Sequence, residues 1–308
     1  MKIPKIDKDY PYMYARVSSK RSKLLDRNDY EKLIKMKPNE IARNLQEGEY
    51  KQDMDALGSR YEGARLVELA LSRNLSRTLS DIAEMSSGHL EEAIKIYLRR
   101  YDLISIKRLL RWKKSGENER IEDLFIPVST FDFSELKELS ELEFEEIIER
   151  IDFECEVDYS SYIDTEDELR EIERCIDQAY FDELDVLAEK VSSSHFEDFI
   201  RTEMRYENLK VALRLKRYDI SEDDIRNRLL KNGNDTVLEE VVSAEDIEEA
   251  KQVLAREGMI TDSGESLEDI EHALEVSRLE DAVKMLHTEP LGLTSILGYV
   301  VAKIVEIK

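Results

Sequence analysis

Three features of the sequence predict an all-α protein. Charged residues make up 38% of the 308 residues, while the chain holds only 10 Gly and 5 Pro, so turn-forming residues are scarce. Apolar side chains recur every three or four residues, and the strict alternation that marks half-buried strands is rare. The third feature is repetition of helical segments over about one hundred residues, which indicates how the helices are organised.

The expected helices fall into a recurring order along the chain. A charged helix is predicted at Tyr30–Leu45, another at Phe133–Ile148 and a third at Val237–Leu254. Each is followed by a longer helix that contains one of three matching segments, which are Glu68–Leu71, Glu173–Ile176 and Glu271–Leu274. Gly-bearing segments at 115–118, 232–235 and 262–265, together with Pro127 and Pro290, separate the helices.

The clearest repeat pairs Ser105–Lys113 with Asn208–Lys216, in which apolar, Lys, Leu, Arg and Lys positions coincide at a constant offset. We therefore predict three diverged helical units: residues 1–132 with a basic N-terminal segment, residues 133–236, and a shorter unit at 237–308. Such units hide their apolar faces against their neighbours. They can either stack into an open solenoid or close around an axis and leave a central cavity.

Charge and cysteine content exclude several classes of protein. The net charge is −24, which disfavours nucleic-acid binding because phosphate contacts need Lys and Arg. Residues 117–200 hold 29 Asp and Glu against 6 Lys and Arg, which indicates either a solvated acidic face or an acidic wall for a basic partner. Cys155 and Cys175 fit a reduced cytosolic setting. The longest uncharged run, between Glu289 and Lys303, is too short to span a bilayer.

No catalytic constellation emerges from the residues. Segment Gly58–Arg65 has the glycine spacing of a phosphate loop, but Ala64 and Arg65 stand where Lys and a hydroxyl residue would contact phosphate and magnesium. The four histidines lack ligand spacing. We therefore expect no active site, no metal, no cofactor and no small-molecule substrate.

Several segments together resemble the C subunit of archaeal-type rotary ATP synthases, the relative of the d subunit of vacuolar proton ATPases. They are Tyr14–Val17 followed by Leu24–Leu33, Arg100–Asp102 through Arg111–Lys113, Tyr180–Leu184, Glu207–Lys210 through Lys216, and Pro290–Gly292 through Tyr299–Glu306. The resemblance covers essentially the whole chain. Two departures are Ser105, where the family usually shows Asn, and the end of the chain at Lys308, where a third Asn-x-Lys/Arg motif would begin.

The resemblance implies a pseudo-three-fold helical funnel with a central cavity, bound peripherally at the cytoplasmic face of the cell membrane. Its narrow side is expected to sit on the membrane proteolipid ring, and its mouth to receive the central-stalk subunits. Such a subunit transmits torque for ion-coupled ATP synthesis or hydrolysis and performs no chemistry. From the residues alone, the alternative is a soluble α-solenoid scaffold that binds a basic or peptide partner.

Basic residues repeated in the first two units are the candidate docking residues, namely Lys107, Arg111, Lys113, Lys210, Arg214 and Lys216. In the rotor interpretation they direct positive charge toward acidic or carbonyl-rich loops of the ring, for which the planar guanidinium of Arg is well suited. Pairing with acidic neighbours within the chain is the alternative for the same residues.

Overall fold

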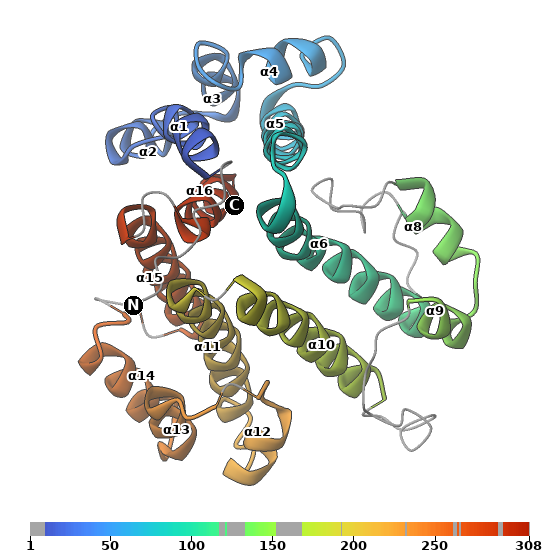
Figure 1. Cartoon of the computed structure of the whole chain (residues 1–308), viewed down its shortest axis with the longest axis vertical. Coiled ribbons are helices and arrows are strands. Elements are labelled where there is room, and N and C mark those ends of the chain that lie inside the picture. Colours follow the sequence, from blue (N-terminus) through green and yellow to red (C-terminus); the bar gives the residue numbers. More distant parts are fainter. Residues whose placement is uncertain are drawn as a thin grey trace. The chain divides into compact units, whose positions relative to one another are not determined.

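The computed structural model describes residues 10–116, 121, 133–151, 168–191, 193–231, 233–260, 264, 266–288 and 292–307. These residues form fifteen helices and no strand, so the predicted all-α class is confirmed (Figure 1). The unit boundary at residue 132, as well as Pro127, Cys155 and Pro290, lies outside the described residues.

The chain divides into two compact units. Unit 1 comprises residues 1–143 and 283–308, and unit 2 comprises residues 144–282. Unit 1 holds α1 (Tyr10–Arg21), α2 (Arg27–Leu33), α3 (Pro38–Leu45), α4 (Lys51–Leu57), α5 (Gly63–Met85), α6 (Gly88–Ser115), α8 (Phe133–Ser140) and α16 (Leu293–Ile307). Unit 2 holds α9 (Phe144–Arg150), α10 (Glu168–Val191), α11 (Ser194–Lys216), α12 (Glu222–Arg228), α13 (Thr236–Ser243), α14 (Ile247–Arg256) and α15 (Leu267–Thr288) as far as Ala282.

Each short charged helix predicted from the sequence is in fact two helices. The predicted helix at Tyr30–Leu45 corresponds to α2 and α3, that at Phe133–Ile148 to α8 and α9, and that at Val237–Leu254 to α13 and α14. The first break has a clear cause, since Pro38 occupies the start of α3, where its missing N–H and fixed φ are tolerated. The last break is set by Asp246, whose side chain caps α14.

Two long helices follow each of the first two short pairs in sequence. They are α5 and α6 after the first pair, and α10 and α11 after the second; after the third come α15 and the shorter α16. The expected helices through Glu68, Glu173 and Glu271 are therefore present as α5, α10 and α15. The order is approximate, because α4 stands between the first short pair and α5, and α12 lies between α11 and the third short pair.

Unit 1 has an apolar core between α3, α4 and α5. Ala42 and Leu45 from α3, Met54 from α4, and Leu66 and Ala70 from α5 are all buried there. The C-terminal α16 also belongs to this unit and contacts α1 and α5 (red beside blue in Figure 1). Unit 1 is thus built from both ends of the chain.

Unit 2 has an apolar core on the C-terminal half of α11. Leu209 and Leu213 of α11 pack with Val241 and Val242 of α13, with Leu254 of α14, and with residues of α12 and α15. The N-terminal ends of α11 to α14 are all capped by side chains that accept a hydrogen bond from a backbone N–H in the first turn, which are those of Ser193, Ser221, Asp235 and Asp246. These caps fix where each helix begins and so place the basic face of α11.

Candidate docking surface

Three of the six candidate residues lie in the C-terminal part of α6. The side chain of Arg111 is exposed, and those of Lys107 and Lys113 are partly exposed. The Lys113 ammonium lies 5.6 Å from the ring centroid of Trp112, a cation–π contact. Because a helix C-terminus carries partial negative charge, Lys113 in the last turn is also stabilised by the helix dipole. Neither contact cancels the charge of the ammonium, so Lys113 keeps its positive charge at the end of α6.

The other three candidates, on α11, have partners inside unit 2. The Lys210 ammonium lies 3.1 Å from Glu207 and 3.2 Å from Glu275. The Arg214 guanidinium donates two hydrogen bonds to Glu271, at 2.6 and 2.8 Å, and these raise the pKa of Arg214. At these positions the structure shows the intramolecular pairing that the sequence left open.

Lys216 is the most enclosed of the six. It is 9% exposed, and its ammonium donates to the carbonyl oxygen of Ala244, just beyond α13. Burial lowers the pKa of Lys216, while the nearby carboxylates of Glu222 and Glu249 oppose that shift. In unit 2 this lysine ties the end of α11 to the short helices.

The two matching helices end alike although their residues differ. Gly116, after α6, has φ 61°, and Asp219, at the equivalent position after α11, has φ 53°. In both cases a left-handed residue follows the helix, as in common C-terminal capping motifs. The nine-residue match in sequence therefore extends to the backbone of the following turn.

Sequence reasoning missed the role of Asn208, which begins the second copy of the match. Its side chain is buried and clamps the backbone of Leu230: the amide nitrogen donates to the carbonyl at 2.9 Å, and the amide oxygen accepts from the N–H at 2.8 Å. Ser105 in the first copy is also buried, and its hydroxyl donates to the carbonyl of Tyr101 in its own helix. An Asn among apolar residues of a helix was the available signal, because a buried amide must be hydrogen-bonded.

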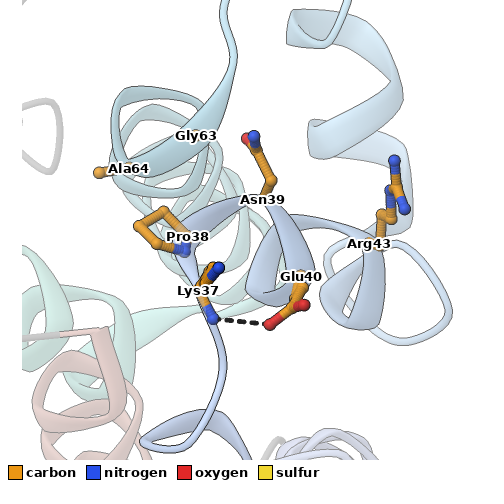
Figure 2. Close-up of a pocket in the computed structure, with 7 residues that line it drawn as sticks. All are labelled: Lys37, Pro38, Asn39, Glu40, Arg43, Gly63 and Ala64. Atoms are coloured by element: carbon orange, nitrogen blue, oxygen red, sulfur yellow. Dashed lines mark hydrogen bonds between the residues drawn. The ribbon is translucent and has the colours of Figure 1, made fainter.

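The segment with phosphate-loop spacing borders a pocket in unit 1. Figure 2 shows this pocket where the start of α3 meets the start of α5, with Gly63 and Ala64 on one side and Lys37 and Glu40 on the other. The Glu40 carboxylate accepts a hydrogen bond from the backbone N–H of Lys37 at 2.8 Å. The Glu40 carboxylate is thus used to cap the start of α3.

The comparisons with known proteins address the chain as a whole. Residues 13–308 match the family model described as ATP synthase (C/AC39) subunit. The chain belongs to this family.

Three relatives named as the C subunit of A-type ATP synthase are similar to this chain over most of their length. The chain is 32% identical to the C subunit of the A-type ATP synthase of Methanococcoides burtonii, over 97% of this chain and 87% of that protein. The corresponding protein of Haloferax volcanii is 30% identical over 95% and 88%, and that of Archaeoglobus fulgidus is 29% identical over 97% and 89%. The resemblance inferred from the sequence is confirmed. Within the described residues, no helix of this family member is both long and apolar enough to cross a membrane.

Proposed function

We propose that this subunit is a non-catalytic adaptor of the central stalk in a rotary ATP synthase. It joins the rotor shaft to the membrane proteolipid ring at the cytoplasmic face and transmits torque between ion flow and ATP turnover. The observation that carries the proposal is the family match over residues 13–308, together with relatives named as the C subunit of A-type ATP synthase that align over nearly their whole length.

The helical architecture suits a part that transmits torque. The long helices α5, α6, α10, α11 and α15 have 22 to 28 residues, so α6, the longest, extends for about 42 Å. Their backbone hydrogen bonds run along the helix axis, and buried side chains hold neighbouring helices together. Such elements deform less under load than loops.

We further propose that the three helical units close around one axis as a funnel. The first two short pairs are each followed in sequence by two long helices, and the third pair by one long and one shorter helix, which supports three related units. Closure buries apolar surface on both sides of every unit, whereas an open stack leaves two end faces that need polar caps. Small-angle scattering from the isolated subunit distinguishes a compact hollow particle from the elongated arc of a solenoid.

Docking to the ring is assigned to the α6 end in this proposal. Lys210 and Arg214 of α11 already form ion pairs with Glu207, Glu271 and Glu275. At the α6 end, by contrast, Lys113 contacts an aromatic ring, which leaves its positive charge in place for an acidic or carbonyl-rich loop. Charged rim contacts of this kind weaken with salt, because screening acts over about 8–10 Å at physiological ionic strength.

The test is recovery of the proteolipid ring with a tagged subunit from detergent-solubilised membranes across a salt series. The wild-type subunit is expected to retain the ring at low salt, and Lys113→Glu to lose it at several-fold lower salt. Lys95→Glu is the matched control, because Lys95 lies in the same helix but near its other end, beside Glu91. If the wild type never retains the ring, the adaptor function is wrong; if the wild type retains it and Lys113→Glu behaves in the same way, the α6 assignment alone is wrong.

A further inference from the structure

The C-terminal helix α16 is the most deeply buried element of unit 1. Twelve of its fifteen residues, from Leu293 to Ile304, are buried, and it contacts α1 and α5. All twelve are apolar or small polar residues except Lys303, which is 2% exposed. A buried ammonium is costly unless it is fully paired, so its surroundings determine how α16 is held.

The Lys303 ammonium is paired on two sides. It lies 2.6 Å from the carboxylate of Glu306, one turn further along α16, and 2.8 Å from the hydroxyl of Tyr50. It also lies 4.4 Å from the centroid of the Tyr50 ring, a cation–π contact. Tyr50 is buried and directly precedes α4, so the ion pair of α16 is anchored in the N-terminal part of the chain.

Glu306 extends the same cluster to the region between α1 and α2. Its side chain is 4% exposed, and it accepts a hydrogen bond from the backbone N–H of Leu25 at 2.6 Å. The hydroxyl of Tyr30 donates to the backbone carbonyl of Glu306 at 3.3 Å. The last turn of α16 is therefore bound to three separate N-terminal sites, which are Leu25, Tyr30 and Tyr50.

We propose that α16 acts as a clasp, by which we mean a helix that holds the N-terminal helices of unit 1 together. The Lys303–Glu306–Tyr50 cluster allows α16 only two states, fully bound or fully released. The contacts join residues more than 250 positions apart, so they form only when the end of the chain returns to its beginning. A partly withdrawn helix would keep the Lys303–Glu306 pair but would part Lys303 from the Tyr50 hydroxyl and Glu306 from the Leu25 N–H while both charges are still shielded from water, which is costlier than either the bound or the fully released state. The inference concerns the fold of the chain and does not depend on the rotor function.

The clasp has a consequence for how the subunit forms and holds its shape. With α16 released, α1 and α5 lose the face on which it packs, and the apolar residues of α16 are exposed to water. Residues 10–57 are therefore expected to open more readily when α16 is released. Unit 2 has its own core and its own buried ion pair, so it is expected to remain folded when α16 is released.

The experiment is amide hydrogen exchange, measured by peptide on the full-length chain. Glu306→Gln removes the carboxylate that is hydrogen-bonded to the buried Lys303 and leaves only the more distant charge of Glu49 to offset it. We expect exchange in residues 10–57 and 293–307 to rise at least 100-fold, with residues 236–256 of unit 2 unchanged. The double variant Lys303→Met, Glu306→Gln is expected to regain part of the protection, because it leaves no unpaired charge.

The matched control breaks the buried pair of unit 2. Glu203 and Arg278 are 5% and 7% exposed at their side chains, and Arg278 Nε donates to Glu203 at 2.7 Å. Glu203→Gln should accelerate exchange in α11 and in residues 267–282, while α1 and α16 stay protected. If Glu306→Gln prevents folding, Tyr50→Phe removes only the hydroxyl contact and should raise exchange a few-fold in the same segments. The proposal is overturned if Glu306→Gln or Tyr50→Phe accelerates amide exchange equally in both units. It is also overturned if either variant leaves α1 and α16 as protected from exchange as in the wild type.

Discussion

Asn208 offers the sharpest test of how the second repeat is held together. Its side chain satisfies both the N–H and the carbonyl of Leu230, a backbone position that follows α12 and is 9% exposed. Asn208→Leu keeps a side chain of similar length but removes both hydrogen bonds. Asn208→Ala removes the same bonds and leaves a small cavity as well.

The expected cost follows from two buried backbone groups that lose their partners. Each such group costs about 1–3 kcal/mol. Since Leu230 is not wholly inaccessible to water, we expect the lower half of that range, about 2–4 kcal/mol in total. At about 1.4 kcal/mol per factor of ten, this corresponds to an increase in opening of about 30- to 700-fold.

Amide exchange of peptides covering residues 209–216 and 222–231 measures this opening. Asn208→Leu and Asn208→Ala should behave alike if the hydrogen bonds dominate, whereas recovery in the Leu variant would indicate that packing dominates. Asp198→Ala is the control, because the exposed Asp198 lies in the same helix α11 but far from Leu230 and should change exchange in these peptides little. If the exchange rate rises less than about 3-fold in both Asn208 variants, the hydrogen bonds from Asn208 to Leu230 do not hold this region together.

Two further predictions concern the helix ends and the response to alkali. Asp219→Gly should stabilise unit 2 by about 0.5–1 kcal/mol in urea denaturation, since a left-handed non-Gly residue is strained. Gly116→Ala should destabilise unit 1 by about 1 kcal/mol, because it introduces the same strain. Changes of the same sign in both variants would contradict this. Burial and a nearby carboxylate raise the pKa of Tyr30 to about 12, and burial raises that of Tyr50 further. A folded pKa above the unfolded value near 10 means that their stabilisation is complete below pH 10 and is lost above it. Burial also raises the pKa of Tyr299 in α16, which acts in the same direction as Tyr30 and Tyr50, whereas burial lowers the pKa of Lys303, which acts in the opposite direction. Unit 1 should therefore lose stability as the pH rises above 10, and the loss should be less steep in Tyr50→Phe. Urea denaturation at each pH measures the stability, and tyrosinate absorbance follows the ionisation. A stability that does not change between about pH 9 and 11.5 would contradict the prediction.

The sequence predicts the helical class well because periodicity is a local property. It fails at the short helices, since the residues from Tyr30 to Leu45 keep an apolar stripe across a break that Pro38 introduces. A stripe does not show whether one helix or two angled helices bear it. The capping residue Asp246 was a visible signal for the third break, because Asp before an apolar run is a common helix start.

The candidate site was predicted less well, for a physical reason. Whether a lysine or arginine is available to a partner depends on carboxylates distant in sequence, and Glu271 lies 57 residues from Arg214. Local spacing finds pairs three or four residues apart, such as Lys210 with Glu207, but not these. The buried cluster of Lys303 and Tyr50 escaped for the same reason, although a single lysine at the end of the longest uncharged run suggested a buried partner.

The two repeated basic helices show that equivalent residues need not offer equivalent charge. In α11, Arg214 already donates two hydrogen bonds to Glu271, so an external carboxylate that used the same donors would have to displace an internal one. The binding free energy that Arg214 can give a partner is therefore the difference between the new arginine–carboxylate pair and the Glu271 pair it replaces, which is small. Lys113, whose contact with the Trp112 ring leaves its charge in place, offers a partner more of its interaction energy. Under the proposed function, contacts with a symmetric ring would therefore be unequal even if the backbone is pseudo-symmetric: Lys113 of the first copy would dock, whereas Lys210 and Arg214 of the second hold α15 against α11.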